Sequence, residues 1–276
     1  MLIDAHAHLQ PKHEKLDEVV SSGIFEQIWL MDLSGAEITY TPFASEDEVL
    51  EVSRRYEGFF IPFGYLDLEK SAETVDRQKE KGFVGLKPYK PLKPYNDPSY
   101  FPIYERAQAL GMPIMFHTGL VAYGKPGQQG EQLSHGPGNM RPSMLDSIAE
   151  AFPRLTIIGG HLGYPWLEET AAHLYYYPNI YHDLSGYRKD VEWLIKNLDR
   201  KCHDGTKRYF NDKILFATDV FYGGAEGHKD AFKLATFWEL FLEMIGGYYY
   251  RWGEPEEREK VLRGNARKIF DSWQGA

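Results

Sequence analysis

Short, β-rich apolar runs alternate with longer amphipathic segments along the whole chain, and this alternation restricts the fold more than any other feature. It is typical of repeated βα units that build a parallel sheet. The apolar runs predict strands at Leu2–His8, Glu26–Leu33, Phe59–Leu66, Phe83–Pro88, Pro113–His117, Leu155–His161, Ile180–Leu184 and Lys213–Asp219. Eight strands at intervals of about 34 residues favour an α/β fold of the (β/α)₈ TIM-barrel type over a doubly wound sheet.

The segments between the strands predict helices. A helix is expected after each strand, for example at Glu46–Tyr56, Ser71–Lys81, Ser99–Leu110, Arg141–Phe152 and Arg188–Lys201, with an extra C-terminal helix near Glu256–Trp273. Ser45 with Glu48 fits a capping box, and Ser71 begins a looser one. Gly82 and Gly111 stand where a left-handed residue would end a helix. Since no linker or repeat interrupts the chain, we predict a single domain over residues 1–276.

Two predicted connections are longer than simple βα turns. Gly119–Met140 follows the fifth strand, is rich in Gly, Pro and Gln, and has no helical period. Lys90–Pro98 follows the fourth strand. In a barrel both would overhang the C-terminal face, where βα loops form active sites.

Charge and cysteine content restrict the function. The 31 Lys and Arg residues against 40 Asp and Glu give a net charge of −9, with no basic stripe. This argues against a nucleic-acid or anionic-membrane partner. Cys202 is the only cysteine, which excludes an intramolecular disulfide framework or a Cys-rich zinc site. Neither a signal peptide nor a long apolar segment is recognisable, so we expect a cytoplasmic protein.

Several of the ten histidines fall at the ends of predicted strands. His6 and His8 are two residues apart in the first strand, so their side chains point the same way. His117 ends the fifth strand, His161 the sixth and Asp219 the eighth. In a barrel, four imidazoles and one carboxylate would therefore meet at the mouth.

This combination of donors predicts a metal site. Imidazole nitrogen and carboxylate oxygen suit Zn²⁺, and also Mn²⁺ or Fe²⁺, whereas Ca²⁺ and Mg²⁺ prefer more oxygen ligands. Three or four protein ligands leave a position for water, whose pKa the ion would lower. The first-strand pair also shares its parity with Asp4. Each histidine taken alone has a structural explanation; their joint placement favours the metal.

The remaining histidines have weaker predictions. His182 has the opposite parity to Asp183, and we interpret it as outward-facing. His135 and His228 lie in predicted mouth loops and could contact substrate. For three others we predict no functional role: His13, His173 and His203.

Ordered motifs carry a family resemblance from the first strand to the last helix: DAHAHL, MFHTG, GGHLGYPW, PNIYHDLSG, FATDV and GNARKIF. Together they resemble the amidohydrolase superfamily. More narrowly they resemble its amidohydrolase-related branch, which contains aminocarboxymuconate-semialdehyde decarboxylase, resorcylate decarboxylase and several lactonases. The resemblance implies a (β/α)₈ barrel with one catalytic divalent metal, often zinc.

The resemblance also implies roles for individual residues. It makes His6, His8, His117 and Asp219 the metal ligands. His161 matches a histidine that handles protons or polarises the substrate, a role that suits an imidazole with a pKa near neutrality.

Several further residues are predicted to bind substrate. In binuclear relatives a carboxylated lysine of the fourth strand bridges two metals. Because this branch is mostly mononuclear, we prefer a charged Lys87 that pairs with a substrate carboxylate. Arg141 is a second candidate for an anionic group. The other candidates at the mouth are Tyr89, Tyr123, Asp183 and Tyr222.

The leading functional hypothesis is a metal-dependent hydrolase of a small ester, lactone or amide that carries a carboxylate. Asp219 and His161 would handle protons. The second hypothesis is a non-oxidative decarboxylase with the same ligands, acting on a small unsaturated or aromatic acid. The third is a non-catalytic barrel that binds a small acid. The tyrosine runs Tyr175–Tyr177 and Tyr248–Trp252 could form a homodimer interface.

Overall fold

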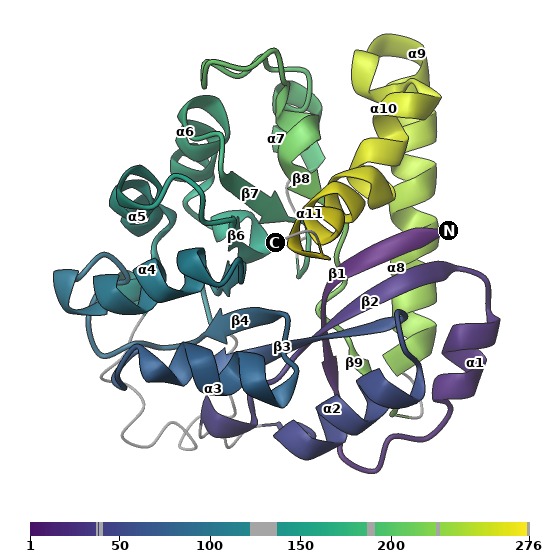
Figure 1. The fold of residues 1–276 in the computed structure, drawn as a ribbon. Helices are drawn as coiled ribbons and strands as arrows, with labels where there is room; N and C mark the ends of the chain where they lie inside the picture. The colour runs from purple at the N-terminus through teal and green to yellow at the C-terminus, as the bar shows by residue number, and fades with distance from the viewer. Residues whose placement is uncertain (37, 39–40, 122–136, 187–190, 225–226, 275–276) are drawn as a thin grey trace, which may run out of the picture.

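The computed structural model describes residues 1–36, 38, 41–121, 137–186, 191–224 and 227–274. These residues form one parallel sheet in the order β8-β7-β6-β5-β4-β3-β2-β1-β9, surrounded by helices (Figure 1). The strands are β1 (Leu2–Leu9), β2 (Phe25–Met31), β3 (Phe60–Leu66), β4 (Gly85–Pro88), β5 (Ile114–Phe116), β6 (Ile157–Gly159), β7 (Ile180–Asp183), β8 (Ile214–Leu215) and β9 (Phe221–Tyr222).

The segment from β8 to β9 closes the sheet into a barrel. Ala5 N donates to Phe216 O at 3.0 Å, and Asp219 N donates to His6 O at 2.8 Å. Further along, β9 pairs in parallel with the end of β1. β8 and β9 are therefore two parts of one eighth strand, interrupted where Asp219 takes a left-handed backbone with φ 57°. The predicted (β/α)₈ barrel is confirmed, although its last strand is broken rather than continuous to Asp219.

Helices follow the strands: α1 (Leu16–Ser21), α2 (Glu46–Arg55), α3 (Glu73–Lys81), α4 (Phe101–Ala109), α5 (Asp146–Ala151), α6 (Leu167–Tyr176), α7 (Val191–Asn197), α8 (Gly227–Phe241), α9 (Gly247–Tyr249), α10 (Pro255–Glu259) and α11 (Asn265–Gln274). The Ser45–Glu48 capping box is confirmed, since each side chain accepts from the other residue's backbone N–H. The looser box at Ser71 is wrong: α3 begins two residues later, after Ala72, with no side-chain cap.

Other helix predictions differ at their ends. The helix expected from Arg141 begins only at Asp146, because Arg141 is extended and Pro142 starts a 3₁₀ turn. Residues 188–190 of another predicted helix lie outside the described residues. The expected C-terminal helix consists of α10, a π-helical turn and α11. The helices α1, α6 and α8 agree with the expectation of a helix after every strand, although no bounds were predicted for them, and α9 was not expected.

The barrel interior is filled below the mouth. Trp29, Phe63 and neighbouring side chains form a buried inner cluster, and Trp273 of α11 packs against both rings with centroids 5.0 and 5.6 Å away. Gly85 leaves room for Phe63, whose ring would lie 2.2 Å from an added Cβ. Because α11 closes the end of the barrel where the strands begin, the cavity lies at the opposite end, where the strands finish.

A bulge in β1 directs its two histidines into the barrel. The pairing with β2 is irregular between Asp4 and Ala7. Ala5 belongs to the inner cluster, whereas Ala7 belongs to the outer cluster between sheet and helices. The irregularity reverses the alternation, so His6 and His8 point inward at the mouth. Asp4 does not share their direction, which corrects the parity expected from sequence.

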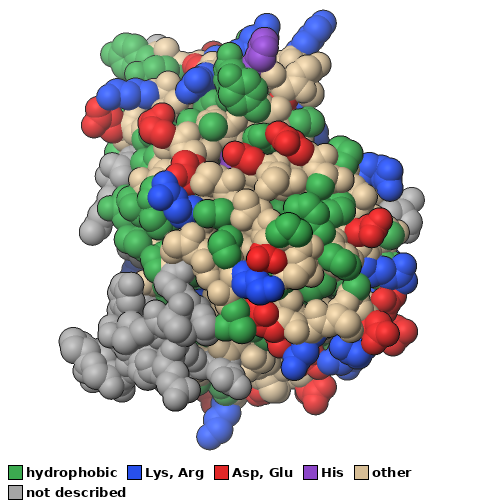
Figure 2. Space-filling model, turned by 90° about the vertical axis from the view of Figure 1, so that its left-hand side faces the viewer, with side chains coloured by type: hydrophobic (Ala, Val, Ile, Leu, Met, Phe, Trp, Pro, Cys, Tyr) green, Lys and Arg blue, Asp and Glu red, His purple; other side chains and the backbone are tan. Residues whose placement is uncertain are grey.

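The described surface is mixed in character. Figure 2 shows one face on which Lys and Arg are interspersed with Asp and Glu and with scattered apolar side chains. None of the described helices combines the length and apolar character needed to cross a membrane.

Candidate active site

A cavity of about 470 Å³ opens at the C-terminal ends of the strands. Among the described residues, the charged and imidazole groups that line it are His6, His8, Lys87, His117, His161 and Asp219. The apolar and aromatic lining consists of Leu33, Phe43, Tyr89, Leu120, Tyr164 and Phe221. The cavity thus combines basic and metal-ligating groups with walls suited to a flat or partly apolar molecule.

Three side chains place donor atoms together in this cavity. Ligand atoms of His6, His8 and Asp219 all lie within 4.8 Å of one another. His8 Nε2 is 3.2 Å and His6 Nε2 is 3.6 Å from Asp219 Oδ1. Two imidazoles and one carboxylate are a donor set that fits a divalent transition metal.

Hydrogen bonds orient both imidazoles for this role. His6 Nδ1 is 2.9 Å from Asp183 Oδ2, and His8 Nδ1 is 2.9 Å from Met31 O. Each Nδ1 must donate to its acceptor, which leaves a lone pair on each Nε2, and that of His6 faces Lys87 Nζ at 3.2 Å. Burial and the positive charge of Lys87 lower the pKa of His6 to about 4, so its imidazole is neutral near pH 7.

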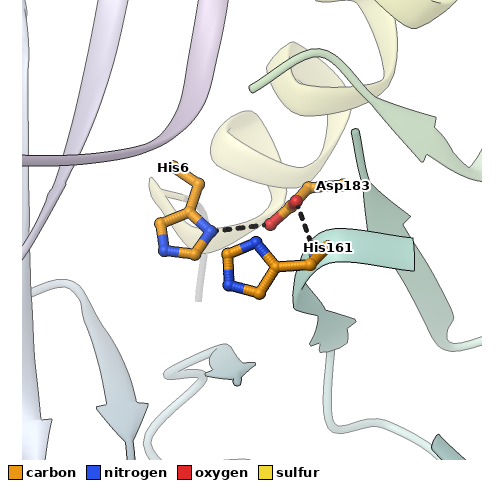
Figure 3. A group of neighbouring side chains, drawn as sticks. All are labelled: His6, His161 and Asp183. Carbon is orange, nitrogen blue, oxygen red and sulfur yellow. Dashed lines mark hydrogen bonds and ion pairs between the residues drawn. The ribbon is translucent and has the colours of Figure 1, made fainter. Parts of the chain in front are cut away.

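The Asp183 carboxylate fixes the orientation of the His6 imidazole. Figure 3 shows its carboxylate between His6 and the backbone of His161. It also accepts from Ser185 N and Ser185 Oγ at 2.9 and 2.5 Å. Asp183 is buried and both of its oxygens accept hydrogen bonds, so it orients His6 and does not line the cavity, in contrast to its prediction as a substrate contact.

Asp219 is the carboxylate that faces the cavity. Burial opposes its ionisation, but its interactions with His8, His161 and His6 hold its pKa well below the usual range. Asp219 is therefore an anion throughout the physiological range, as a metal ligand or proton acceptor requires.

His161 joins a hydrogen-bonded chain that crosses the mouth. Its Nδ1 is 2.9 Å from Ser185 Oγ, and its Nε2 is 3.2 Å from His117 Nδ1. Ser185 Oγ donates to Asp183, while His117 Nε2 is 3.2 Å from Leu120 O and must donate there. Both ring nitrogens of His161 thus face hydrogen-bond acceptors. This arrangement suits a residue that donates a proton.

His117 lines the same cavity but is not part of the three-donor group. Burial, the positive charge of His161 and that of Lys87 lower its pKa well below the usual value. Its Nδ1 is directed at His161 across the mouth. The structure therefore brings three of the four predicted ligands together, and a ligand role for His117 stays a prediction.

Lys87 lies on the cavity floor and is fully buried. Its Nζ is 3.2 Å from His6 Nε2. Burial lowers the pKa of Lys87 to about 8, against the effect of the Asp183 and Asp219 carboxylates. The amine is thus mostly protonated at pH 7 and offers a positive charge inside the cavity.

Of the other predicted substrate contacts, some line the cavity and others do not. Tyr89 lines the cavity, packed edge-on against His117 with centroids 5.0 Å apart. Arg141 instead bonds to Glu169 and lies over Trp166, and it is not among the described lining residues. Tyr123 and His135 lie outside the described residues.

Tyr222 and His228 do not reach the cavity. Tyr222 is fully buried behind the sheet, where its hydroxyl donates to Asp4 at 3.0 Å. His228 lies on α8, with its Nε2 3.5 Å from Glu18. Both expectations placed these residues in a mouth loop, but β9 continues the barrel wall and α8 begins at Gly227. His182 points outward as predicted, to His173 on α6, with Nε2 and Nδ1 3.1 Å apart.

Asp4 has a role that its sequence position did not reveal. Its Oδ1 accepts from Thr218 N at 2.9 Å, and its Oδ2 accepts from Thr218 Oγ1 at 2.6 Å and from Tyr222. Asp4 thereby holds the residue next to Asp219 and supports the left-handed turn in the eighth strand. No local signal distinguishes such a carboxylate from one that faces the cavity.

We expect Asp4→Ala to lower the free energy of unfolding by about 3 kcal/mol or more, because buried donors of Thr218 and Tyr222 lose their acceptor. Asp4→Asn should cost much less, since the amide oxygen still accepts from Thr218 N and both hydroxyls can rotate. Chemical denaturation measures both. Equal losses in the two variants would contradict this role.

The isosteric variant also gives a pH test. Burial raises the pKa of Asp4 from 3.8 to about 7. Folded Asp4 therefore binds its proton more tightly than in the unfolded chain, and its contribution to stability declines as pH rises from about 4 to 7. Relative to wild type, Asp4→Asn should become more stable across that interval. A stability difference independent of pH would contradict the shift.

The sequence matches the amidohydrolase family profile over residues 3–271, so the chain belongs to the amidohydrolase family. Curated proteins provide no significant match. The family, the barrel and the cluster of imidazoles and carboxylate together define a metal-dependent enzyme of the amidohydrolase superfamily.

Solved structures share the fold at low sequence identity. An uncharacterised TIM-barrel protein from Bordetella bronchiseptica is 17% identical, with a TM-score of 0.70 and 99% coverage of both chains. A dihydroxybenzoic acid decarboxylase from Polaromonas sp. JS666, with bound manganese and the inhibitor 2-nitroresorcinol, is 20% identical, with a TM-score of 0.58 and coverage of 94% and 86%. A probable 2-pyrone-4,6-dicarboxylic acid hydrolase from Acinetobacter baumannii, with bound citric acid, is 13% identical, with a TM-score of 0.57 and coverage of 98% and 99%.

Proposed function

We propose that the protein is a metal-dependent hydrolase of a small ester, lactone or amide that carries a carboxylate group. The observation behind this proposal is the placement of the His6, His8 and Asp219 donors beside the buried cation of Lys87 in one cavity. The metal donors and the cation are close enough to act on two groups of the same small molecule.

The residues that would hold the metal are His6, His8 and Asp219, with His117 as a fourth donor in the same cavity. A bound divalent ion lowers the pKa of water and polarises a carbonyl. We expect zinc; manganese is the metal in one structural neighbour.

The chain's own groups would carry the protons. Asp219, an anion at neutral pH, takes a proton from the attacking water, whose oxygen adds to the carbonyl carbon. The bond to the leaving oxygen or nitrogen then breaks, and His161 donates a proton to that atom. Lys87 would hold the substrate carboxylate, and Phe43 and Phe221 would enclose the remainder.

A decarboxylase is the second candidate, favoured by the proton that His161 can supply and by decarboxylases among the structural neighbours. In that reaction the bond between the substrate carbon and the carboxylate breaks and CO₂ leaves. The electron pair stays on the carbon, which then takes a proton from His161. The same pocket walls would hold the ring of an aromatic acid.

A substrate panel with metal analysis tests these alternatives. The purified protein is expected to carry about one equivalent of a divalent metal, and chelation should abolish turnover. Acid release from lactones, esters or amides supports the hydrolase, whereas CO₂ release from aromatic acids supports the decarboxylase. Metal-loaded protein that binds these acids but turns over none would favour the non-catalytic barrel.

Lys87→Met is expected to raise KM for carboxylate-bearing substrates about 10- to 100-fold, because a hydrogen bond to a charged group is worth about 1.5–3 kcal/mol. A neutral analogue that lacks the carboxylate should be affected far less. Steady-state kinetics on the two substrates provide the measurement. A matched KM increase for both would show that Lys87 supports the site without binding the carboxylate.

A further inference from the structure

The turn that carries His161 has an unusual backbone. His161 (φ 59°, ψ 28°) and Leu162 (φ 48°, ψ 15°) are both left-handed, and Gly163 follows with φ 68°. In the part of the chain that the structure describes, His161 and Leu162 are the only two adjacent non-glycine residues with positive φ. Consecutive left-handed residues that carry a Cβ atom are unfavourable, and they persist only where the surrounding structure imposes them. We call Gly160–Gly163 the His161 turn.

The left-handed backbone sends two neighbouring side chains to different places. The His161 imidazole lines the active-site cavity beside His6, with ring centroids 5.0 Å apart (Figure 3). Leu162 is fully buried in the outer cluster between the sheet and the helices, and its burial opposes the cost of the backbone. A turn that relaxed to ordinary backbone angles would redirect the imidazole. The place of His161 in the cavity therefore depends on the groups that hold the turn.

Two of these groups hold the peptide bond between Gly160 and His161. Asp183 Oδ1 accepts from His161 N at 2.9 Å, and Thr118 Oγ1 donates to Gly160 O at 2.5 Å. Both side chains lie next to predicted metal ligands, the first by a hydrogen bond and the second along the chain. Their replacement would disturb the metal site as well as the turn.

Thr170 holds the other end of the turn from a greater distance. It lies on α6, is fully buried, and is not among the described residues that line the cavity. Its Oγ1 donates to Leu162 O at 2.6 Å. A helical threonine commonly donates to a carbonyl three or four residues earlier, whereas this bond leaves α6 and reaches eight residues back. A Cβ on Gly163 would lie only 2.8 Å from Thr170 Oγ1, so α6 packs directly against the turn.

We propose that Thr170 is a positioning residue for His161: its hydroxyl keeps the His161 turn left-handed and thereby keeps the imidazole in the cavity. The inference rests on the proposed function in one respect, the role of His161 as proton donor. The eighth strand offers a parallel, because Asp219 is also left-handed and Asp4 holds it through the neighbouring Thr218. Both groups that handle protons in the proposed reaction thus lie on strained backbone that a buried side chain maintains.

Esters with two different leaving groups test the proposal. The probes are the methyl and 4-nitrophenyl esters of one carboxylic acid, given to the zinc-loaded enzyme. Methoxide needs a proton from His161 as it leaves, whereas 4-nitrophenolate does not. Thr170→Val should lower kcat for the methyl ester about 100-fold, the loss typical of a group misplaced by about 1 Å, and should change KM and kcat for the 4-nitrophenyl ester less than about threefold. Thr170→Ser keeps the hydroxyl and should restore kcat.

Ser53→Ala is the matched control. Ser53 is buried on α2, and its Oγ donates to Val49 O at 2.9 Å. Loss of this bond should lower the thermal stability as Thr170→Val does, yet leave kcat for both esters at the wild-type value. Comparable kcat losses in Ser53→Ala and Thr170→Val would show that destabilisation alone explains the effect, and would overturn the proposal. Equal kcat losses for both esters in Thr170→Val would overturn it too.

Nitrogen NMR of the zinc-loaded protein, with labelled histidine, gives a readout that needs no turnover. His161 Nε2 lies 3.2 Å from His117 Nδ1, so the ring resonances of His161 report its position. They should shift in Thr170→Val and coincide with those of wild type in Thr170→Ser and Ser53→Ala. Wild-type His161 resonances in Thr170→Val would contradict the positioning role. If wild type hydrolyses neither ester, the proposed function fails, and these spectra alone decide the role of Thr170.

Discussion

Replacing His6 with alanine is expected to lower the affinity for a divalent metal more than about 100-fold, beyond the 10- to 100-fold typical of residues that only orient a ligand. His6 supplies one of three donor atoms that lie within 4.8 Å of one another. Its loss leaves only His8 and Asp219 of this cluster. Equilibrium dialysis against zinc or manganese, followed by elemental analysis, measures the effect without requiring a known substrate.

His203→Ala is the matched control. His203 is exposed and stacks on Tyr175, far from the described lining of the cavity. The substitution removes one imidazole from the chain and leaves the His6, His8 and Asp219 cluster unchanged, so the metal stoichiometry should remain at the wild-type value. Unchanged metal affinity in His6→Ala would refute the assignment of the site. Equal losses in both variants would show nonspecific binding to surface imidazoles.

The second large effect is expected from Asp183→Asn, which changes a proton position while keeping the shape of the side chain. The amide oxygen can still accept from the backbone N–H groups of His161 and Ser185. Its NH₂ group, however, would face His6 Nδ1, which donates to the carboxylate in the wild type and would have to accept from the amide in the variant. His6 would then carry its proton on Nε2, directed at Asp219, and could not bind a metal there.

We therefore expect Asp183→Asn to remain folded but to bind metal about 100-fold more weakly. Nitrogen NMR of the His6 ring should report the change of tautomer. Asp183→Ala is the comparison variant: it leaves several buried donors without an acceptor and should also lose about 3 kcal/mol or more of stability. Wild-type metal affinity in Asp183→Asn would show that this carboxylate does not control the His6 proton.

The sequence predicted the barrel because hydrophobic periodicity survives in nearly every strand. Helix ends were predicted where the signal was local, as at the Ser45–Glu48 capping box and at Gly82. The start of α5 was not, since Pro142 diverts the chain into a 3₁₀ turn. A helix after the eighth strand was expected, but the sequence did not give the bounds of α8.

Part of the candidate site could also be predicted from the positions of the strands. A barrel brings the ends of its strands to one mouth, so His6, His8, His117, His161 and Asp219 could be grouped before any side chain was placed. Residues on the loops and on the last strand could not be assigned in this way. Asp183 and Tyr222 lie near the mouth in sequence, yet both are buried beneath or behind it.

The sequence alone determined the family, the barrel and the types of group that meet at its mouth, because periodicity and strand-end chemistry are local properties of the chain. Only the tertiary structure decided which way those groups point. The irregular pairing in β1 turns His6 and His8 inward and leaves Asp4 behind the sheet, where it holds Thr218. Such directions depend on hydrogen bonds between residues more than 200 positions apart, which no local pattern records.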